Sequence, residues 1–215
     1  MTKLSVLGVG RVGSAIARAA VAAGYDVAVA ASGPAADIAL LTEVVIPGAK
    51  AMDAAEASRH GDIVVVAVPL HKHRNVEPGS LGGKVVVDVM NYWPPVDGEL
   101  DQFEDDPRST SEVVADHFAG ARLVKAFNHI GYHELEEHRL PKGSPRRRAL
   151  AVASDHPSAA AAVADLVDRI GFDVVHSGPL ATGVAFEPGT RIFNGAFTAD
   201  ELSELLGAQA QRLAG

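Results

Sequence analysis

Residues 3–13 read KLSVLGVGRVG and contain three glycines in the pattern Gly8-x-Gly10-x-x-Gly13. An apolar stretch precedes the pattern, and an Ala-rich stretch and a second apolar stretch follow it. The pattern alone is weak, but strand, glycine turn, helix and strand within about 30 residues form the βαβ unit that binds dinucleotides. The first glycine permits a tight turn, the second lets the backbone approach a pyrophosphate, and the third lets the helix pack closely on the strand. The sequence therefore predicts a dinucleotide site near its N-terminal end.

The same alternation of strands and helices continues along the chain. We expect strands at 3–7, 26–31, 44–52, 62–68, 84–88, 123–127, 148–153 and 172–176, and helices at 11–23, 35–41, 53–59, 109–118, 155–171 and from 198 onward. This order predicts an α/β fold of the Rossmann type: a doubly wound, mainly parallel sheet with helices on both faces. We expect an NAD(P)-binding domain over 1–180. A short C-terminal helical appendage, the loop and helix of 181–215, would pack on it because so few residues cannot form a separate core.

Composition narrows the class of protein. The 215 residues are 47% hydrophobic and carry a net charge of -8, which disfavours nucleic-acid binding because phosphates are neutralised by Lys and Arg. There is no cysteine, which excludes disulfides, thiolate metal sites and cysteine nucleophiles. Arg11 and Arg18 interrupt the apolar N-terminal stretch, unlike a secretory signal, and no apolar run reaches membrane-spanning length. We expect a cytoplasmic protein without a membrane partner.

The end of the second predicted strand bears on the choice between NAD and NADP. Residues 31–34 read ASGP, whereas NAD sites usually place Asp or Glu there to hold the ribose hydroxyls. Without that carboxylate, Ser32 and the N–H of Gly33 can donate to a 2′-phosphate, which favours NADP over NAD. No Arg follows Ser32, so Arg11 or Lys72 would have to supply the cation.

Three later strand ends carry further candidate residues. In open α/β sheets ligands bind beyond the carboxyl ends of the strands, near the point where strand order reverses. The candidates for the ribose and nicotinamide are Ala67, Val68, Pro69, His71, Met90, Asn91, Ala126 and Asn128. Asn91 and Asn128 would orient a carboxamide or a substrate, or else serve turn geometry, which Asn also favours.

Histidines are frequent after the fourth and sixth expected strands, 62–68 and 123–127, at this edge of the sheet. His71 and His129 are the candidate catalytic residues, as proton donors lining the substrate pocket; the alternative is solvated loop histidines. Together with His73, His133 and His138 they suggest a metal site, but no carboxylate completes a known spacing. We therefore expect no metal.

Several stretches together resemble the NADP oxidoreductase, coenzyme F420-dependent family. They are the glycine loop, the Ala-Val-Pro strand end at 67–69, and the segments 88–91 (DVMN), 125–128 (KAFN) and 177–180 (SGPL). The likeness extends over about residues 3–180. Members of this family move a hydride between NADPH and the deazaflavin coenzyme F420. They carry apolar C-terminal helices that shape the deazaflavin pocket, whereas residues 184–195 here are loop-like and the last helix is short and polar.

The resemblance implies roles for particular residues. Val9, Gly10, Arg11 and Val12 would contact the pyrophosphate, and Ser32 and Gly33 would face the 2′-phosphate. The residues lining the ribose and nicotinamide would be Ala67, His71, Met90 and Ala126. Gly33 stands where the family commonly has Arg.

Two functions remain open at this point. The first is an NADP(H)-dependent oxidoreductase that transfers a hydride between nicotinamide and a small-molecule acceptor, with coenzyme F420 as a possible co-substrate. The alternative is a non-catalytic dinucleotide-binding or redox-sensing module, since a fold does not fix a function. In either case we expect a homodimer.

Overall fold

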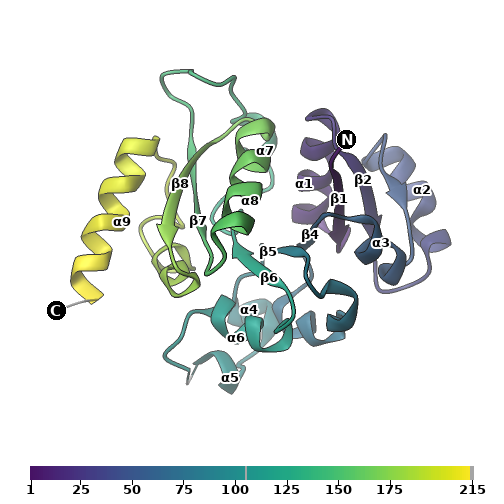
Figure 1. Cartoon of the computed structure of the whole chain (residues 1–215), viewed down its shortest axis with the longest axis horizontal. Helices are drawn as coiled ribbons and strands as arrows, with labels where there is room; N and C mark the ends of the chain where they lie inside the picture. The colour runs from purple at the N-terminus through teal and green to yellow at the C-terminus, as the bar shows by residue number, and fades with distance from the viewer. Residues whose placement is uncertain (105, 214–215) are drawn as a thin grey trace.

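The computed structural model describes residues 1–104 and 106–213, which form an eight-stranded sheet in the order β3-β2-β1-β4-β5-β6-β7-β8 (Figure 1). The strands are β1 (Lys3–Leu7), β2 (Asp26–Ala30), β3 (Lys50–Ala51), β4 (Ile63–Val66), β5 (Val85–Asp88), β6 (Arg122–Lys125), β7 (Ala149–Ala153) and β8 (Asp173–Gly178). The α-helices are α1 (Arg11–Ala22), α2 (Ala35–Val45), α3 (Ala54–His60), α4 (Pro94–Asp97), α5 (Asp101–Glu104), α6 (Thr110–His117), α7 (Glu134–Glu137), α8 (Pro157–Ile170) and α9 (Ala199–Leu213). The 3-10 helices are η1 (Leu70–Asn75), η2 (Pro78–Leu81) and η3 (Leu180–Phe186).

Side chains of the central strands alternate between the two faces of the sheet, which divides the core into two layers. Leu4 and Val6 of β1 belong to a cluster with side chains of α1 and α8. Leu7 of β1 belongs to a second cluster, which includes side chains of α3 and α6. Successive residues of a strand point to opposite faces, so a strand rich in Val and Leu is buried on both sides. The Rossmann-type, doubly wound fold expected from the sequence is confirmed.

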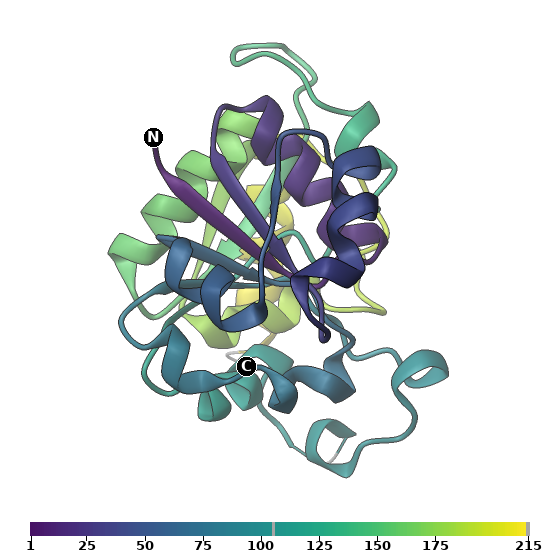
Figure 2. The ribbon, with the colours of Figure 1, turned by 90° about the vertical axis from the view of Figure 1, so that its right-hand side faces the viewer.

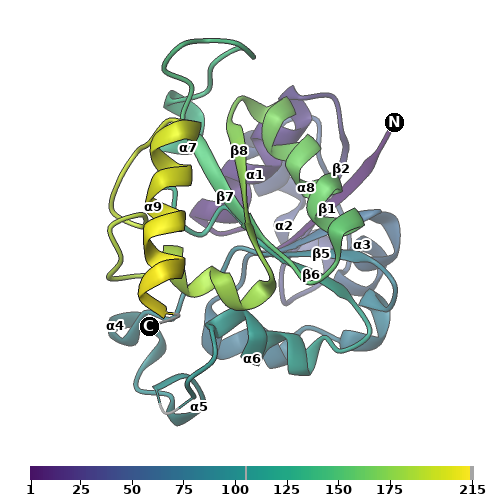
Figure 3. The ribbon, with the colours of Figure 1, turned by 60° about the vertical axis from the view of Figure 1, so that its left-hand side comes forward.

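The last two strands run against the rest of the sheet. β6 pairs with β7 antiparallel through Lys125 and Ala153, whereas β7 and β8 pair parallel to each other. A third cluster joins β7 to η3 and α9 and includes Phe186 and Leu202. Figure 3 shows α9 lying along β7 and β8, at the edge of the sheet far from β1. The sheet is therefore mainly parallel, and the C-terminal segment packs on its far edge.

Some local predictions were wrong. The strand expected at 44–52 is reduced to two residues, because α2 continues to Val45 where a short helix to 41 was expected. The stretch 91–108, in which no helix or strand was expected, contains α4 and α5. Among the described helices, none combines the length and apolarity needed to cross a membrane.

Candidate functional site

The glycine loop between β1 and α1 has the geometry that its sequence predicts. Gly8 lies at a φ of +112°, a conformation that favours glycine, and turns the chain out of β1. A Cβ on Gly13 would lie 1.9 Å from the Gly8 carbonyl oxygen, so only glycine lets the helix begin this close to the strand end. A Cβ on Gly10 would meet no atom within 4 Å. The loop thus leaves open space above Gly10, beside the first N–H groups of α1, which have no acceptor within the helix.

This loop borders a cavity of about 450 Å³ at the carboxyl ends of β1, β2 and β4. The strand order reverses between β1 and β4, which is where Rossmann folds bind dinucleotides. The lining of the cavity includes seven of the predicted cofactor residues: Gly8, Val9, Gly10, Ser32, Ala67, Val68 and Pro69. The sequence missed the residues that α3 and η2 contribute, such as Ser58 and Ser80, because no local pattern places them at this edge. The cavity is the candidate dinucleotide site.

Charged side chains bear on the part of the site at the end of β2. Lys72 of η1 lines the same cavity as Ser32, so it is the predicted cation that the structure brings to this cavity. Asp37, in the first turn of α2, also comes close, since a Cβ on Gly33 would lie 3.0 Å from its Oδ2. The sequence prediction that no carboxylate stands here overlooked Asp37, which the helix brings back toward the strand end.

Arg11 occupies a different part of the site from Lys72. Its Nη1 lies 3.3 Å from the Tyr132 hydroxyl, and its guanidinium lies 5.6 Å from the centre of the Tyr132 ring. Tyr132 follows β6, so Arg11 is held beside the β6 loop and not beside Ser32. This position suits contact with a pyrophosphate, as the resemblance implies, better than contact with a 2′-phosphate. Val12 is 37% exposed at the start of α1.

The two predicted asparagines face each other. Asn91 donates from Nδ2 to the Asn128 carbonyl oxygen at 2.7 Å, and Asn128 donates from Nδ2 to Asn91 Oδ1 at 3.1 Å. Asn128 also donates to the Phe186 carbonyl oxygen at 2.9 Å, which uses both of its amide hydrogens. Among the described residues, no acceptor takes the second amide hydrogen of Asn91. The hydrogen bonds of Asn128 fix the position of the Asn91 side chain.

The backbone before Asn128 is strained. Phe127 has a φ of 61°, in the left-handed region that bulky residues rarely adopt, and its side chain is 1% exposed in the core. Such a conformation costs on the order of 1–3 kcal/mol and persists where the surrounding structure enforces it. Here it turns the chain sharply after β6 and directs Asn128 toward Asn91.

His129 is a buried structural residue in this arrangement. It is 3% exposed, and its Nε2 accepts a hydrogen bond from the Ala151 N–H at 3.0 Å. Its Nδ1 lies 3.2 Å from Asn128 Oδ1, to which it donates. Burial lowers the pKa of His129 to about 3, and the charges of Arg148 and Lys125 act in the same direction. The ring is therefore neutral, has both nitrogens engaged, and does not reach the cavity as the predicted catalytic role requires.

Met90 and Ala126 also lie in the core, at 4% and 0% exposure, and neither is among the residues that line the cavity. Beneath them lies a fully buried ion pair, with Lys125 Nζ 3.2 Å from Asp88 Oδ2. Lys125 also donates to the Met90 carbonyl oxygen, and Ser111 Oγ donates to Asp88 Oδ2. This pair ties the ends of β5 and β6 together. It supports the backbone that carries Asn91 and Asn128.

His71 is positioned by a carboxylate that the sequence did not indicate. Its Nδ1 lies 2.8 Å from Oδ1 of Asp97, whose side chain is 3% exposed, while the His71 side chain is 32% exposed. The same Oδ1 accepts the backbone N–H of His71 at 3.2 Å, and Oδ2 accepts that of Trp93 at 2.9 Å. Burial raises the pKa of Asp97, but these hydrogen bonds together outweigh it and hold the pKa below its usual value. Asp97 is thus an ionised partner for the His71 ring.

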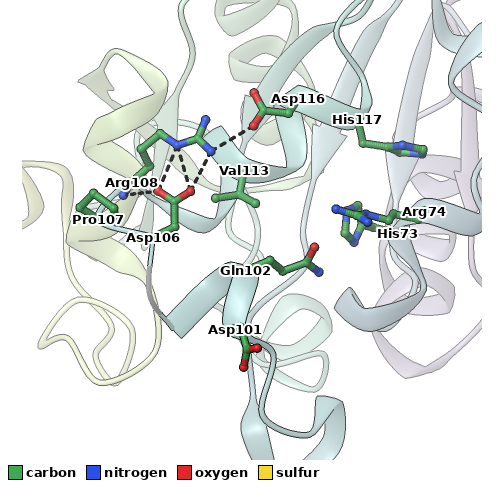
Figure 4. Close-up of a pocket in the computed structure, with 10 residues that line it drawn as sticks. All are labelled: His73, Arg74, Asp101, Gln102, Asp106, Pro107, Arg108, Val113, Asp116 and His117. Carbon is green, nitrogen blue, oxygen red and sulfur yellow. Dashed lines mark hydrogen bonds and ion pairs between the residues drawn. The ribbon is translucent and has the colours of Figure 1, made fainter.

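A second cavity, of about 700 Å³, lies between η1 and α6 (Figure 4). Figure 4 shows His73 and His117 on one side and Arg108 on the other, where Arg108 pairs with Asp106 and Asp116. His73 donates from Nδ1 to the Leu70 carbonyl oxygen, and burial lowers its pKa, so it stays neutral. Within residues 1–104 and 106–213, no three His, Asp or Glu side chains are placed to hold a metal ion. Arg108, Asp106 and Asp116 pair with one another at one wall of this cavity, and we assign the cavity no role.

Comparison with known proteins agrees with this geometry. Residues 3–92 match the model of the family described as NADP oxidoreductase coenzyme F420-dependent, which confirms the predicted resemblance over that part of the chain. This part contains the glycine loop, Ser32, Lys72, His71 and Asn91. The Escherichia coli protein YjhV is 45% identical over 56 residues, which span 26% of this chain and 41% of that protein.

Solved structures extend the likeness to nearly the whole chain. The hypothetical protein SMa0349 from Sinorhizobium meliloti is 28% identical, with a TM-score of 0.79 over 92% of this chain and 96% of that one. A candidate F420-dependent NADP-reductase from Arthrobacter sp. FB24 is 22% identical, with a TM-score of 0.71 over 99% of this chain and 93% of that one. At this identity the second likeness shows the shared fold alone.

Proposed function

We propose that this protein is an NADP(H)-dependent oxidoreductase that transfers a hydride between the nicotinamide of NADP(H) and a small-molecule acceptor. The observation that carries the proposal is the cavity at the β1–β4 switch point, bordered by Gly10 and by Ser32 with Lys72. Gly10 leaves room and free N–H groups for a pyrophosphate, and Lys72 offers a cation to a 2′-phosphate. The match of residues 3–92 to an NADP oxidoreductase family supports the same assignment.

The nicotinamide half of the cofactor would lie over the ends of β4, β5 and β6. On this side Asn91 has a free amide hydrogen for the carboxamide, and Arg11 stands at the pyrophosphate end of α1. The residues present fit three polar parts of the cofactor: Gly10 suits the pyrophosphate, Lys72 the 2′-phosphate and Asn91 the carboxamide. Asp37 opposes the 2′-phosphate as a like charge. The chain binds and orients the ring, and bound NADPH supplies the hydride.

Cofactor choice is tested by titrating NADPH and NADH against the protein and following the nicotinamide fluorescence at fixed salt concentration. We expect NADPH to bind more tightly. Lys72→Ala should weaken NADPH binding by about tenfold and leave NADH unchanged, because a charged hydrogen bond to the phosphate contributes about 1.5–3 kcal/mol. Asp37→Asn should strengthen NADPH binding by removing a like charge. Equal affinities for the two cofactors in the unmodified protein would contradict the assignment of NADP.

Lys142→Ala is the matched control, because the side chain of this lysine is 81% exposed and pairs with Asp168 of α8, away from the cavity lining. Its loss should change neither affinity.

Oxidoreductase activity is tested by following NADPH oxidation at 340 nm with a set of acceptors that includes coenzyme F420 and free flavins. The family name makes the deazaflavin the first acceptor to try. Oxidation with any acceptor of the set supports an enzyme. Tight NADPH binding without turnover of any acceptor would instead favour the dinucleotide-binding module.

A further inference from the structure

The His71–Asp97 pair has the geometry of an oriented acid–base residue. The Asp97 carboxylate accepts from His71 Nδ1, from the His71 backbone and from the Trp93 backbone, so neither oxygen is free to turn away. A histidine held through Nδ1 keeps that nitrogen protonated and presents Nε2 outward. Among the described residues, His71 Nε2 has no hydrogen-bond partner, and about a third of the side chain is open to solvent.

The position of the pair in the fold places it on the nicotinamide half of the site. His71 follows Pro69 at the carboxyl end of β4, and Asp97 belongs to the segment that follows β5. β4 and β5 both lie on one side of the switch point between β1 and β4. β2, which leads to Ser32, lies on the other side. In Figure 2, β1 runs from the N-terminus toward the side of the molecule where the teal segments of 91–108 lie. His71 follows the cavity-lining residue Pro69, so a proton donor at this place would stand next to the region in which we expect the hydride acceptor to bind.

The helix that carries Asp97 is tied down and exposes apolar side chains. The Tyr92 hydroxyl accepts from the Leu100 N–H at 2.9 Å and donates to Glu104 at 2.8 Å, which closes the segment around α4. On the same turn, Trp93 and Val96 are 47% and 65% exposed. A large aromatic and a branched apolar side chain exposed on the turn that carries Asp97 suit an acceptor with an apolar body.

We infer that His71 is the proton donor of this site, that Asp97 is its positioning residue, and that the acceptor is a carbonyl compound bearing an apolar or aromatic group. The inference rests on the proposed function, because it names the acceptor class of the same reaction. A carbonyl needs such a donor, since the oxygen gains charge as the hydride arrives; a deazaflavin, whose charge is spread over a planar ring, depends on it far less.

The reaction balances as follows. The hydride from bound NADPH brings two electrons to the carbonyl carbon. The electron pair of the C=O π bond moves to the oxygen, which takes a proton from Nε2 of protonated His71. His71 returns to the neutral form and keeps its Nδ1 proton, which it donates in a hydrogen bond to Asp97. Solvent water then reprotonates Nε2. The products are an alcohol and NADP⁺, and in the reverse direction neutral His71 accepts the proton.

The experiment uses the full chain, NADPH, and benzaldehyde and phenylacetone as carbonyl probes, with coenzyme F420 as the comparison acceptor. His71→Asn keeps a donor near Asp97 and removes Nε2. We expect it to lower kcat with the carbonyl probes about 100-fold or more, and to lower the rate of any deazaflavin reduction by a much smaller factor. Asp97→Asn should lower kcat and leave KM nearly unchanged, and Asp97→Glu should restore part of it. His156→Asn, at an exposed position at the start of α8, is the control.

A second measurement does not depend on turnover. Nitrogen-15 NMR of the histidine rings should show neutral His71 as the Nδ1–H form, and Asp97→Asn should shift it toward a mixture with the Nε2–H form. Two results would overturn the inference: no reduction of either carbonyl probe, or full activity of His71→Asn with them. Deazaflavin reduction without carbonyl reduction would overturn the acceptor class alone, whereas NADPH binding without any oxidation would overturn the proposed function as well.

Discussion

Gly10 and Gly13 lie three residues apart in one turn, yet the structure predicts opposite consequences for adding a methyl group to each. At Gly13 the new Cβ would stand 1.9 Å from a backbone oxygen, against about 3.4 Å for ordinary contact, so the start of α1 must move by about 1.5 Å. Overpacking of this kind costs about 3 kcal/mol at the upper end of its range, and the better helix propensity of Ala returns about 1. Gly13→Ala should therefore lose about 2 kcal/mol of unfolding free energy, or about 4–8 °C in Tm.

Gly10→Ala adds its methyl group in open space at an ordinary backbone conformation, with φ at -72°. We expect its Tm to fall by only about 1–3 °C, because Ala is a poorer N-cap residue than Gly by about 0.5–1 kcal/mol and no steric clash is added. Its NADPH affinity should fall at least about tenfold, or about 1.4 kcal/mol, because the methyl group occupies the approach to the pyrophosphate. Stability and binding are thus separated within one loop.

The assay is thermal unfolding without cofactor, followed by fluorescence titration with NADPH at fixed salt. Gly207→Ala in α9 is the matched control, since a Cβ there also meets no atom within 4 Å, and it should bind NADPH normally. Normal NADPH binding by Gly10→Ala would refute the placement of the pyrophosphate. A Gly13→Ala variant as stable as the parent would refute the packing argument.

Three further predictions concern stability, and each is measured by chemical denaturation. Lys125→Met should cost about 3–5 kcal/mol because it leaves Asp88 buried and unpaired, and adding Asp88→Asn should recover part of this; no recovery would argue against the pair. Ser109→Ala should cost about 1 kcal/mol, since it breaks the capping box that Ser109 forms with Glu112 at the start of α6, whereas an unchanged midpoint would show that the box adds nothing. The pKa of His129 is about 3 in the folded chain and about 6.5 when unfolded, so the unfolded chain binds more protons between these values and stability falls as the pH drops below 6.5. Between pH 7 and pH 5 this group should remove about 2 kcal/mol, and His129→Gln should show a shallower pH dependence than the parent.

The features that sequence predicted well are those whose causes lie within one or two turns of chain. The glycine loop, the strand β4 and the start of helix α6 at Ser109 each depend on neighbours close in sequence, and the structure contains all three. The parallel arrangement of the central strands was predicted from their alternation with helices. By contrast, homodimer formation and a cytoplasmic location stay predictions, because a single chain does not test them.

The features that sequence missed depend on long-range contacts. His129 was predicted as a catalytic candidate from its place after β6, but β7 returns antiparallel and its Ala151 N–H occupies the ring. Asp97 lies 26 residues from His71 in a stretch without periodicity, on a helix of four residues that begins with two prolines. No sequence pattern pairs Asp97 with His71, and only the folded structure brings the two residues together. Asp37 escaped notice for the same reason, since only the direction of α2 brings it back to Gly33.

The segment between β5 and α6 carries more information about the acceptor than the C-terminus does. In the sequence, the short, polar C-terminal helix is the feature that differs from the apolar helices with which the F420-dependent family shapes its deazaflavin pocket. In the structure, α9 packs through Leu202 on β7 and β8, at the edge of the sheet far from the glycine loop. The residues that can face the nicotinamide from outside the Rossmann unit belong instead to 91–104, where Asp97 orients His71 and Trp93 is exposed. Exchange of 93–100 with the corresponding segment of a relative should therefore change which acceptor is reduced, whereas shortening α9 should change stability.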